Sequence, residues 1–236
     1  MDQAENLELL KVFEGLRAAD VRDGMDSEGY YHYGSVNPKF RPMAGGIRTI
    51  GIAKTARFLP YAGTDPNSAP GEECDGWIKE SSASAESGAA DAFWSDIRPG
   101  DFVCLDLADT DCGVIDSADS LRLRTKDCAG YLVNGGARDI DEMISQKIPV
   151  WAKPVSQRGV SGFKASFYEA DIPVAIGGAA IYPGDVVVAD GDGVVVVPRG
   201  IAREVGEWAR GVIVHDKVDR KSHYVKLGME LDDTVL

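Results

Sequence analysis

The residues best suited to chemistry are Arg138 and Asp139, which follow an apolar run at 131–134 and the pair Gly135 and Gly136. A strand delivers its last residues to the edge of a sheet, where glycine lets the backbone turn or approach a ligand closely. The Arg138 guanidinium presents a planar fork of donors that matches a carboxylate or carbonyl oxygen, and the Asp139 carboxylate is a hard ligand for a divalent cation. The two side chains are therefore suited to hold a small oxo-acid and the metal ion that polarises it. An ordinary surface ion pair after a strand explains this stretch equally well, so the rest of the chain must decide.

Other motifs that carry chemistry are weaker. His32, His215 and His223 do not have the spacing of a metal site, and no Gly-x-Ser-x-Gly nucleophile elbow occurs. The chain has neither a Walker A motif nor a Gly-x-Gly-x-x-Gly after a strand, which argues against nucleotide binding and a Rossmann methyltransferase. The Asp-Gly-Asp-Gly run at 190–193 is acidic enough for a calcium loop, but apolar residues follow where more oxygen ligands would be needed. We therefore interpret it as a turn.

The charge and composition of the chain limit its partners. It has 25 Lys and Arg against 38 Asp and Glu in 236 residues, a formal net charge of −13. Nucleic acids and anionic membrane surfaces both require a basic face, so we predict neither as a partner. No apolar run is long enough to span a bilayer, the N-terminus lacks the pattern of a secretory signal, and the four cysteines show no CxxC spacing. These features predict a cytoplasmic protein with reduced thiols.

Helix and strand patterns alternate along the chain. An apolar stripe predicts a helix within 5–25, with Asp20 as the N-cap of a second short helix. The remaining patterns predict helices at 77–93, in the region up to about 127, at 139–147 and at 199–211, and strands at 47–59, 102–106, 131–134, 149–153, 172–176, 178–182, 185–189 and 194–198. The last two strands flank the turn at 190–193 and so predict a hairpin. Helices flanking a mixed sheet indicate a layered α/β or α+β protein.

Five motifs in order resemble those of the RraA-like family, which includes the regulator of ribonuclease activity A and the class II 4-hydroxy-4-methyl-2-oxoglutarate aldolases. They occupy residues 19–26, 46–55, 99–106, 130–139 and 184–198. The resemblance implies an α/β fold, an α/β/β/α sandwich of the swivelling-domain type, with mixed sheets and flanking helices. We therefore expect a single domain over residues 1–236, with a core of about 15–210, a polar insertion at about 63–87 and a C-terminal tail at 212–236.

The resemblance also implies an activity and a site. The activity is that of a metal-dependent lyase on small 2-oxo acids: retro-aldol cleavage of a 4-hydroxy-2-oxo acid to pyruvate, with oxaloacetate decarboxylation as a second reaction through the same pyruvate enolate. Asp139 matches the carboxylate that holds Mg²⁺ or Mn²⁺, and Arg138 matches the arginine that binds the 2-oxo group. The loop that grips the substrate carboxylate falls on Asp116, Ser117, Ala118 and Asp119. The resemblance further implies a homotrimer or hexamer with active sites at subunit interfaces.

The loop at 116–119 departs from the family pattern. The family acid that orders the metal's water ligands is replaced by Ser117, with acids at Asp116 and Asp119 instead. Either Asp116 or Asp119 takes over that catalytic role, or the site does different chemistry; simple helix capping explains Asp116 and Ser117 equally well. The retained Arg138–Asp139 pair favours an enzyme. The altered loop favours the family's other function, a non-catalytic ring that binds and regulates another protein through its acidic surface.

Overall fold

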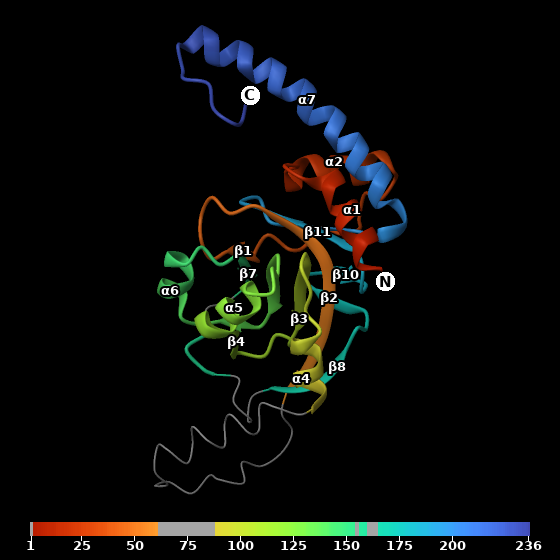
Figure 1. Ribbon diagram of the computed structural model, residues 1–236, viewed down its shortest axis with the longest axis vertical. Coiled ribbons are helices and arrows are strands. Elements are labelled where there is room, and N and C mark those ends of the chain that lie inside the picture. The colour runs from red at the N-terminus through yellow and green to blue at the C-terminus, as the bar shows by residue number, and fades with distance from the viewer. Residues whose placement is uncertain (1, 61–87, 154–155, 160–164) are drawn as a thin grey trace, which may run out of the picture.

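The computed structural model describes residues 2–60, 88–153, 156–159 and 165–236. Its centre is an eight-stranded mixed sheet, in which the strands follow the order β1-β7-β5-β3-β2-β11-β12 and β8 joins by pairing with β2 (Figure 1). The bounds are β1 (Arg41–Pro42), β2 (Thr49–Pro60), β3 (Asp101–Asp106), β5 (Gly130–Asn134), β7 (Val150–Ala152), β8 (Ala165–Ala170), β11 (Val186–Ala189) and β12 (Val194–Val197). Two small pairs of strands accompany it: β9 (Val174–Ile176) pairs antiparallel with β10 (Ala179–Ile181), and β4 (Gly113–Ile115) pairs parallel with β6 (Gly136–Ala137).

The helices form two groups around this sheet. One group contains α1 (Gln3–Phe13), α2 (Ala18–Ser27) and the first half of α7 (Ala202–Leu227), which follows a short 3₁₀ turn, η1 (Arg199–Ile201). The second half of α7 projects beyond this group (Figure 1). The other group contains α4 (Gly88–Ser95), α5 (Ser117–Arg124) and α6 (Ile140–Ser145). The fold is therefore layered, with helices on the outside of a curled sheet.

Four neighbouring strands, β2, β3, β5 and β7, run parallel and end at the same edge of the sheet. Every residue of β3 and β5 is buried, as expected for parallel strands covered on both faces. Because the carboxyl ends of parallel strands are the usual place for ligands in open α/β sheets, the residues that follow β5 are well placed for a site.

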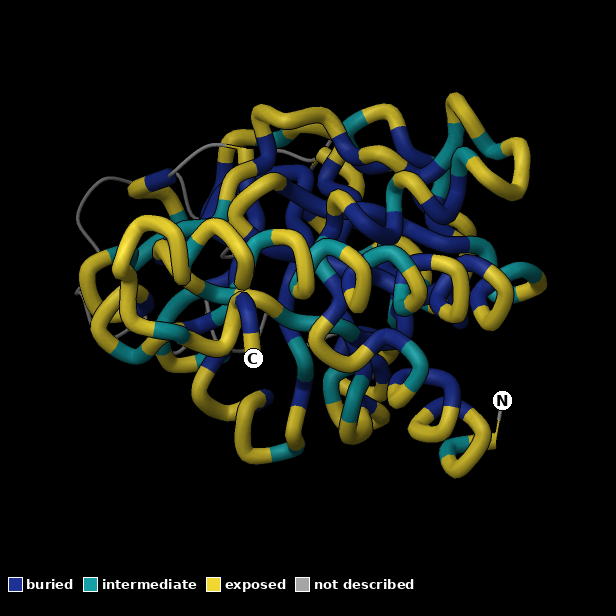
Figure 2. The backbone as a smooth tube through the Cα atoms, turned by 90° about the horizontal axis from the view of Figure 1, so that it is seen from above, coloured by how far each residue is buried: buried dark blue, intermediate teal, exposed yellow. Residues whose placement is uncertain are grey.

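Apolar side chains cover both faces of the sheet. One face packs against α4, α5 and α6 through Phe93, Leu123 and Met143. The other face carries Phe102 and Trp151, which pack with the β9–β10 pair, and a third cluster joins α1, α2 and α7 to the β11–β12 hairpin. Figure 2 shows the result: the buried backbone runs through the interior, and exposed turns surround it. The two helices that lead away from the candidate residues, α5 and α6, are thus anchored in the first of these clusters.

The mixed α/β fold with flanking helices is confirmed, and so is the hairpin at the acidic turn, where β11 pairs antiparallel with β12. Asp190 in that turn accepts the N–H of Ala18 at 2.9 Å and so caps α2 from a distant part of the chain. The prediction of Asp20 as the N-cap is wrong. The cap position is Arg17, and Asp20 lies in the first helical turn, where its carboxylate accepts the Arg17 N–H at 3.2 Å.

Other elements also differ from the sequence prediction: the short strands β1, β4 and β6 were not predicted. The helix expected to end at 211 continues to Leu227 in α7, and its buried face stops at Ile213, which is why the apolar pattern indicated an early end. Strand β8 was not predicted, because most of its residues are not buried and it lacks an apolar pattern. The insertion at 63–87 and most of the helix predicted at 77–93 lie outside the described residues, apart from α4. None of the described helices is long and apolar enough to cross a membrane.

Candidate active site

The end of β5 delivers the candidate residues to the sheet edge. After Asn134 the chain forms β6, which pairs parallel with β4, and the N–H of Arg138 donates to the carbonyl of Ile115 at 3.1 Å. The sequence predicted that Gly135 and Gly136 permit a turn here. Neither has a positive φ; instead, a Cβ on Gly136 would lie 2.5 Å from the Cβ of Ser156. Glycine is therefore required for close packing rather than for a left-handed turn.

Arg138 lies directly against the backbone of β4. A Cβ added to Gly113 would lie 2.8 Å from the Arg138 Cγ and 2.9 Å from its Cβ, so only glycine accommodates the arginine stem in this position. The side chain of Arg138 is 38% exposed, and its Nε lies 3.5 Å from the Asp139 Oδ1, at the limit of a hydrogen bond. The stem is therefore held while most of the guanidinium donors stay available to a ligand.

Asp139 has an unusual backbone. Its φ of 57° and ψ of 44° place it in the left-handed region, and although it occupies the N-cap position of α6, its side chain makes no cap bond. The carboxylate turns instead toward Ser117, 22 residues earlier, whose N–H and hydroxyl both donate to the Oδ2, at 3.3 and 3.2 Å. Five other non-glycine residues of the described chain share the left-handed region, three of them aspartates, so it is the contact with Ser117 that distinguishes Asp139.

The loop at 116–119 forms the start of α5. The Asp116 Oδ1 accepts the N–H of Asp119 at 2.9 Å, which is the N-cap bond that the alternative interpretation expected. The Asp119 carboxylate pairs with Arg122 at 2.9 Å on the exposed side of the helix. Two of the amides that were expected to grip a substrate carboxylate therefore donate within the protein: that of Ser117 to Asp139 and that of Asp119 to Asp116.

Four of the predicted site residues thus meet at one place. Arg138 and Asp139 arrive from β5 and β6, and Asp116 and Ser117 arrive from β4, where parallel pairing of the two short strands brings them together. Ala118 is exposed on the first turn of α5, and Asp119 points along the helix toward Arg122 rather than toward Asp139. The structure therefore makes Ser117, and not Asp119, the loop side chain in contact with Asp139.

The donor set at Asp139 decides what kind of cation it suits. Among the described residues no group of three His, Cys, Asp or Glu side chains could enclose a metal ion. Two oxygen donors that the structure does bring together are the Asp139 carboxylate and the Ser117 hydroxyl, 3.2 Å apart. A small divalent cation such as Mg²⁺ keeps several waters and is often bound through one or two carboxylates, so this sparse oxygen set fits it and does not fit a soft or fully enclosed metal.

A polar row below the site was not predicted from the sequence. Arg57, Asp106 and Asn134 are in register at the carboxyl ends of β2, β3 and β5. The Asp106 carboxylate accepts from the Arg57 Nη2 at 3.0 Å, from the Asn134 Nδ2 at 3.3 Å and from the N–H of Ala108 at 3.0 Å. These hydrogen bonds join the carboxyl ends of β2, β3 and β5, and the candidate site follows β5 in the chain. In the sequence, the row is indicated by Asp106 and Asn134, the polar residues that end two buried apolar runs.

Comparisons with known proteins bear on the same region. A family model described as RraA-like, Aldolase/RraA, matches residues 18–196. A Halalkalibacterium halodurans protein named as a candidate 4-hydroxy-4-methyl-2-oxoglutarate aldolase is 31% identical over 114 residues, 48% of this chain and 53% of that protein. The chain therefore spans about half the length of that curated relative.

Two solved structures are similar over nearly the whole chain. A Pseudomonas syringae protein superposes with a TM-score of 0.71 at 24% identity and covers 98% of both chains. Streptomyces coelicolor RraAS2, described as an unusual member of the RNase ES inhibitor RraA protein family, superposes with a TM-score of 0.68 at 23% identity, over 92% of this chain and 96% of that one. At these identities the likeness shows the fold alone.

Proposed function

Because the chain belongs to the RraA-like family, we propose that it is a metal-dependent lyase that releases pyruvate from small 2-oxo acids at Arg138 and Asp139. The observation that carries the proposal is the convergence of Arg138, Asp139 and Ser117 at the carboxyl edge of the parallel strands. The Asp139 carboxylate makes no cap bond to the helix that it begins and accepts from Ser117 instead, which supports a role other than capping.

Arg138 is assigned to the 2-oxo group. In retro-aldol cleavage of a 4-hydroxy-2-oxo acid, the C3–C4 bond breaks, the 4-hydroxyl loses its proton to become a carbonyl, and the electron pair forms the enolate of pyruvate. The Arg138 guanidinium donates to the oxygen on which that negative charge develops, which is where a donor contributes most to the rate. Loss of CO₂ from oxaloacetate breaks the equivalent bond and gives the same enolate, so one site serves both reactions.

Asp139 is assigned to the divalent cation, Mg²⁺ or Mn²⁺. When bound, the cation supplies Lewis-acid stabilisation of the same developing charge. The N–H and hydroxyl of Ser117 hold the Asp139 carboxylate in one orientation. Asp116 uses its Oδ1 for the helix cap, and we assign its Oδ2 to orienting the water that exchanges the proton at C3 and at the 4-hydroxyl.

The quaternary structure belongs to the same proposal. We expect a homotrimer or a hexamer, with a small 2-oxo acid as the ligand and a single catalytic domain in each chain. Light scattering on the purified protein should give a mass near three or six times 25.3 kDa. A monomer that is fully active would show that the site is complete within one chain and would overturn the shared-interface part of the proposal.

The decisive experiment is a pyruvate-release assay on a panel of 4-hydroxy-2-oxo acids and oxaloacetate, with Mg²⁺, with Mn²⁺ and with chelator. We expect turnover that requires a metal and that is shared by oxaloacetate and at least one hydroxy-oxo acid. Turnover that is unaffected by the chelator would contradict the role of Asp139. No turnover on any member of the panel would contradict the lyase itself.

A second function is favoured by two specific observations. The formal net charge is −13, and Ser117 stands where the aldolase pattern has an acid. A non-catalytic ring that binds a basic protein partner would use that charge and would not need the acid. The two functions are separated by Arg138→Lys, which would abolish most turnover in a lyase and would leave the affinity for a partner protein unchanged in a regulator.

A further inference from the structure

The second half of α7, residues 214–227, forms an arm that projects from the molecule (Figure 1). Three valines of the arm, Val214, Val218 and Val225, are 59%, 68% and 67% exposed. Their spacings of four and seven residues return to the same side of an α-helix, so the three side chains form one apolar stripe along the arm. An aligned apolar stripe that faces solvent is a candidate contact surface.

The other side of the arm is covered by the end of the chain, which turns back along it. The Tyr224 hydroxyl donates to the Asp232 Oδ2 at 3.2 Å, the Lys217 Nζ donates to the Leu236 carbonyl at 2.6 Å, and Val235 is buried. An isolated helix as short as the arm is marginal in water, so these contacts stabilise it. They leave the valine stripe uncovered.

The arm is basic, whereas the rest of the chain is acidic. Residues 214–227 contain four Lys or Arg and two Asp, and the other residues contain 21 Lys or Arg and 36 Asp or Glu. At about 100° per residue, Lys221 lies beside the valine stripe, and the two acids, Asp216 and Asp219, point away from it. Lys221 forms no ion pair within the described part of the chain. The stripe therefore fits an apolar surface that carries an available carboxylate.

A groove with these properties lies between α4 and β8 and has a volume of about 450 Å³. Apolar side chains of both elements line it: Ala89, Ala92 and Phe93 from α4, and Phe167 and Ala170 from β8. Both alanines are exposed, and their small side chains let another helix approach closely. An apolar groove of this kind suits the apolar face of an amphipathic helix.

The groove is also acidic. Its lining includes Asp96, Glu169 and Asp171 against a single base, Lys54. The Lys54 Nζ donates to Asp96 at 2.8 Å and to Asp171 at 3.0 Å, so these two carboxylates already have a partner. Glu169 is exposed and has no ion-pair partner among the described residues. Glu169 is therefore the carboxylate of the groove that is available to a lysine from another molecule.

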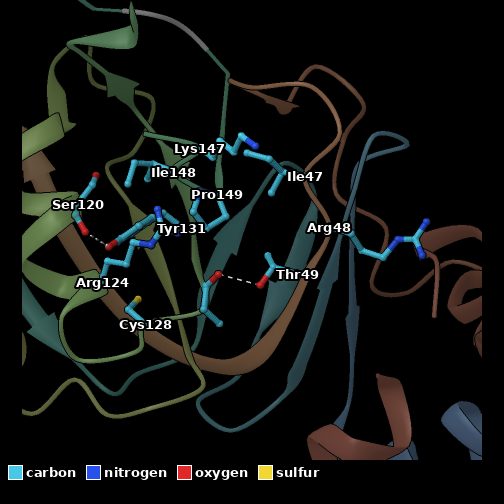
Figure 3. Close-up of a pocket in the computed structure, with 11 residues that line it drawn as sticks. Ile47, Arg48, Thr49, Ser120, Arg124, Cys128, Tyr131, Lys147, Ile148 and Pro149 are labelled. Carbon is cyan, nitrogen blue, oxygen red and sulfur yellow. Dashed lines mark hydrogen bonds between the residues drawn. The ribbon is translucent and has the colours of Figure 1, made fainter. Parts of the chain in front are cut away.

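The arm cannot reach the groove of its own chain, because α7 projects from one end of the molecule and α4 and β8 lie at the other end (Figure 1). A cavity of about 260 Å³ at the amino ends of β2, β5 and β7 suits the arm less well. Arg48, Arg124 and Lys147 line that cavity, and no acid is among its described lining residues (Figure 3). Contact between two arms would likewise bring like charges together. The charges thus favour the groove of a second copy.

We propose that the arm of one copy docks into the α4–β8 groove of a second copy, with the valine stripe on the apolar lining and Lys221 paired with Glu169. The arm and the groove are different surfaces, so repetition of this contact about an axis can close a ring. The contact names surfaces for the assembly that the proposed function expects. It does not rest on lyase activity, because none of its residues touches Arg138 or Asp139, so self-association tests it independently of turnover.

The apolar part of the contact is tested by the dissociation constant of the assembly, measured by sedimentation velocity over a dilution series of the full-length protein. Val218→Asp places a charge in the stripe and should weaken association at least about tenfold. His223→Asp introduces the same side chain at an exposed position on the other side of the arm and should associate as the wild type does. A monomeric wild type, or equal association of the Val218→Asp protein and the wild type, would overturn the proposal.

A charge exchange tests the polar part. Lys221→Glu and Glu169→Lys each place like charges opposite one another and should each weaken association at least about fivefold. The double variant restores an opposite pair and should recover most of that loss, whereas independent sites would give losses that add. Lys39→Glu, at an exposed lysine outside the arm, is the control and should have no effect. Additive losses in the double variant would overturn the pairing of Lys221 with Glu169.

Cross-linking locates the contact. Assemblies formed from isotope-labelled and unlabelled chains are treated with a carbodiimide, which joins a lysine directly to a neighbouring carboxylate. We expect cross-linked peptides of mixed isotope content that join Lys221 to Glu169, and association that weakens as salt is added. Mixed peptides that join Lys221 only to the arm of another chain would show contact between arms and would contradict the proposal.

Discussion

Ser117 donates both its backbone N–H and its hydroxyl to one oxygen of Asp139, at 3.3 and 3.2 Å, across 22 residues of sequence. The contact joins the first residue of α5 to the residue that precedes α6. Under the proposed function, the contact gives the loop a role at the site: the serine holds the Asp139 carboxylate and does not itself carry charge. Substitutions of Asp139 and of the neighbouring Arg138 and Asp116 should therefore have different effects on turnover and on stability.

Replacing Asp139 by asparagine should abolish metal-stimulated turnover and leave the protein folded. Asparagine tolerates the left-handed backbone at this position and retains an oxygen that can accept from Ser117, so we expect the free energy of unfolding to change by less than about 1 kcal/mol. Pyruvate release with and without Mg²⁺, together with urea denaturation, measures both effects. Asp141→Asn, an exposed position in the first turn of α6, is the matched control. Full metal-dependent activity in the Asp139→Asn protein would show that the cation is held elsewhere.

Replacing Arg138 by lysine should lower kcat by about 10² or more, the scale observed when one donor to a developing oxyanion is removed. Lysine keeps the positive charge but loses the planar fork, so KM should change much less than kcat. Steady-state kinetics on the best substrate of the panel measures both constants. Arg158→Lys, an exposed arginine whose Nη1 lies 3.8 Å from Asp111, serves as the control. Unchanged kcat in the Arg138→Lys protein would remove the arginine from the enolate mechanism.

The helix cap and the catalytic role of Asp116 can be separated by two substitutions. Asp116→Ala removes the bond to the Asp119 N–H and should cost about 1 kcal/mol in the free energy of unfolding. Asp116→Asn keeps a capping oxygen and should be nearly neutral for stability, but it removes the carboxylate that we assign to proton exchange. A drop in turnover that appears with Ala and not with Asn would reduce Asp116 to a cap. A drop with both, accompanied by lost stability with Ala only, would support the assignment.

The buried Asp101 carboxylate should make stability depend on pH. Burial raises the pKa of Asp101 above its usual 3.8, and the hydrogen bond from the Arg98 N–H, at 2.8 Å, only partly opposes that shift. The folded protein therefore binds this proton more tightly than the unfolded chain does. The contribution of Asp101 to stability is fully present below pH 3.8, and it is lost as the pH rises through the higher folded pKa. Asp101→Asn should remove this dependence. The free energy of unfolding of the variant minus that of the wild type should therefore increase as the pH rises over that interval. Urea denaturation at several pH values measures it, with exposed Asp23→Asn as the control; a difference that stays constant with pH would show that the pKa of Asp101 is not raised by folding.

The sequence was sufficient for much of the fold because its strongest signals are local. The valine runs on either side of Asp190 and the apolar run before Asn134 predict their strands from residue type alone, and the structure has both. The capping of α2 was different. The N–H of Ala18 is capped by Asp190, a contact between residues 172 positions apart, and no local pattern indicates such a partner. A local pattern therefore favours the nearby Asp20 as the cap.

At the candidate site, too, local motifs were predictable from the sequence and contacts between distant residues were not. Arg138 and Asp139 were identified from a local motif, whereas the partner of Asp139 depends on the pairing of β4 with β6, two strands of three and two residues that are too short to have a pattern. That pairing places Ser117 beside Asp139, and α5 then directs Asp119 toward Arg122. The row formed by Arg57, Asp106 and Asn134 likewise exists only through strand register. The sequence could therefore suggest individual candidate residues, but it could not predict the contacts among them.

The left-handed backbone of Asp139, at a φ of 57°, has a consequence for how relatives of this protein can be sorted. Glycine adopts this conformation at almost no cost, so the backbone here should tolerate Asp139→Gly. Asp109, Asp127 and Asp171 lie in the same left-handed region, so the conformation by itself does not mark a working site. Under the proposed function, a relative with glycine at this position should keep the fold and lose the metal-dependent chemistry, and this one residue would then separate enzymes from scaffolds before any assay is run.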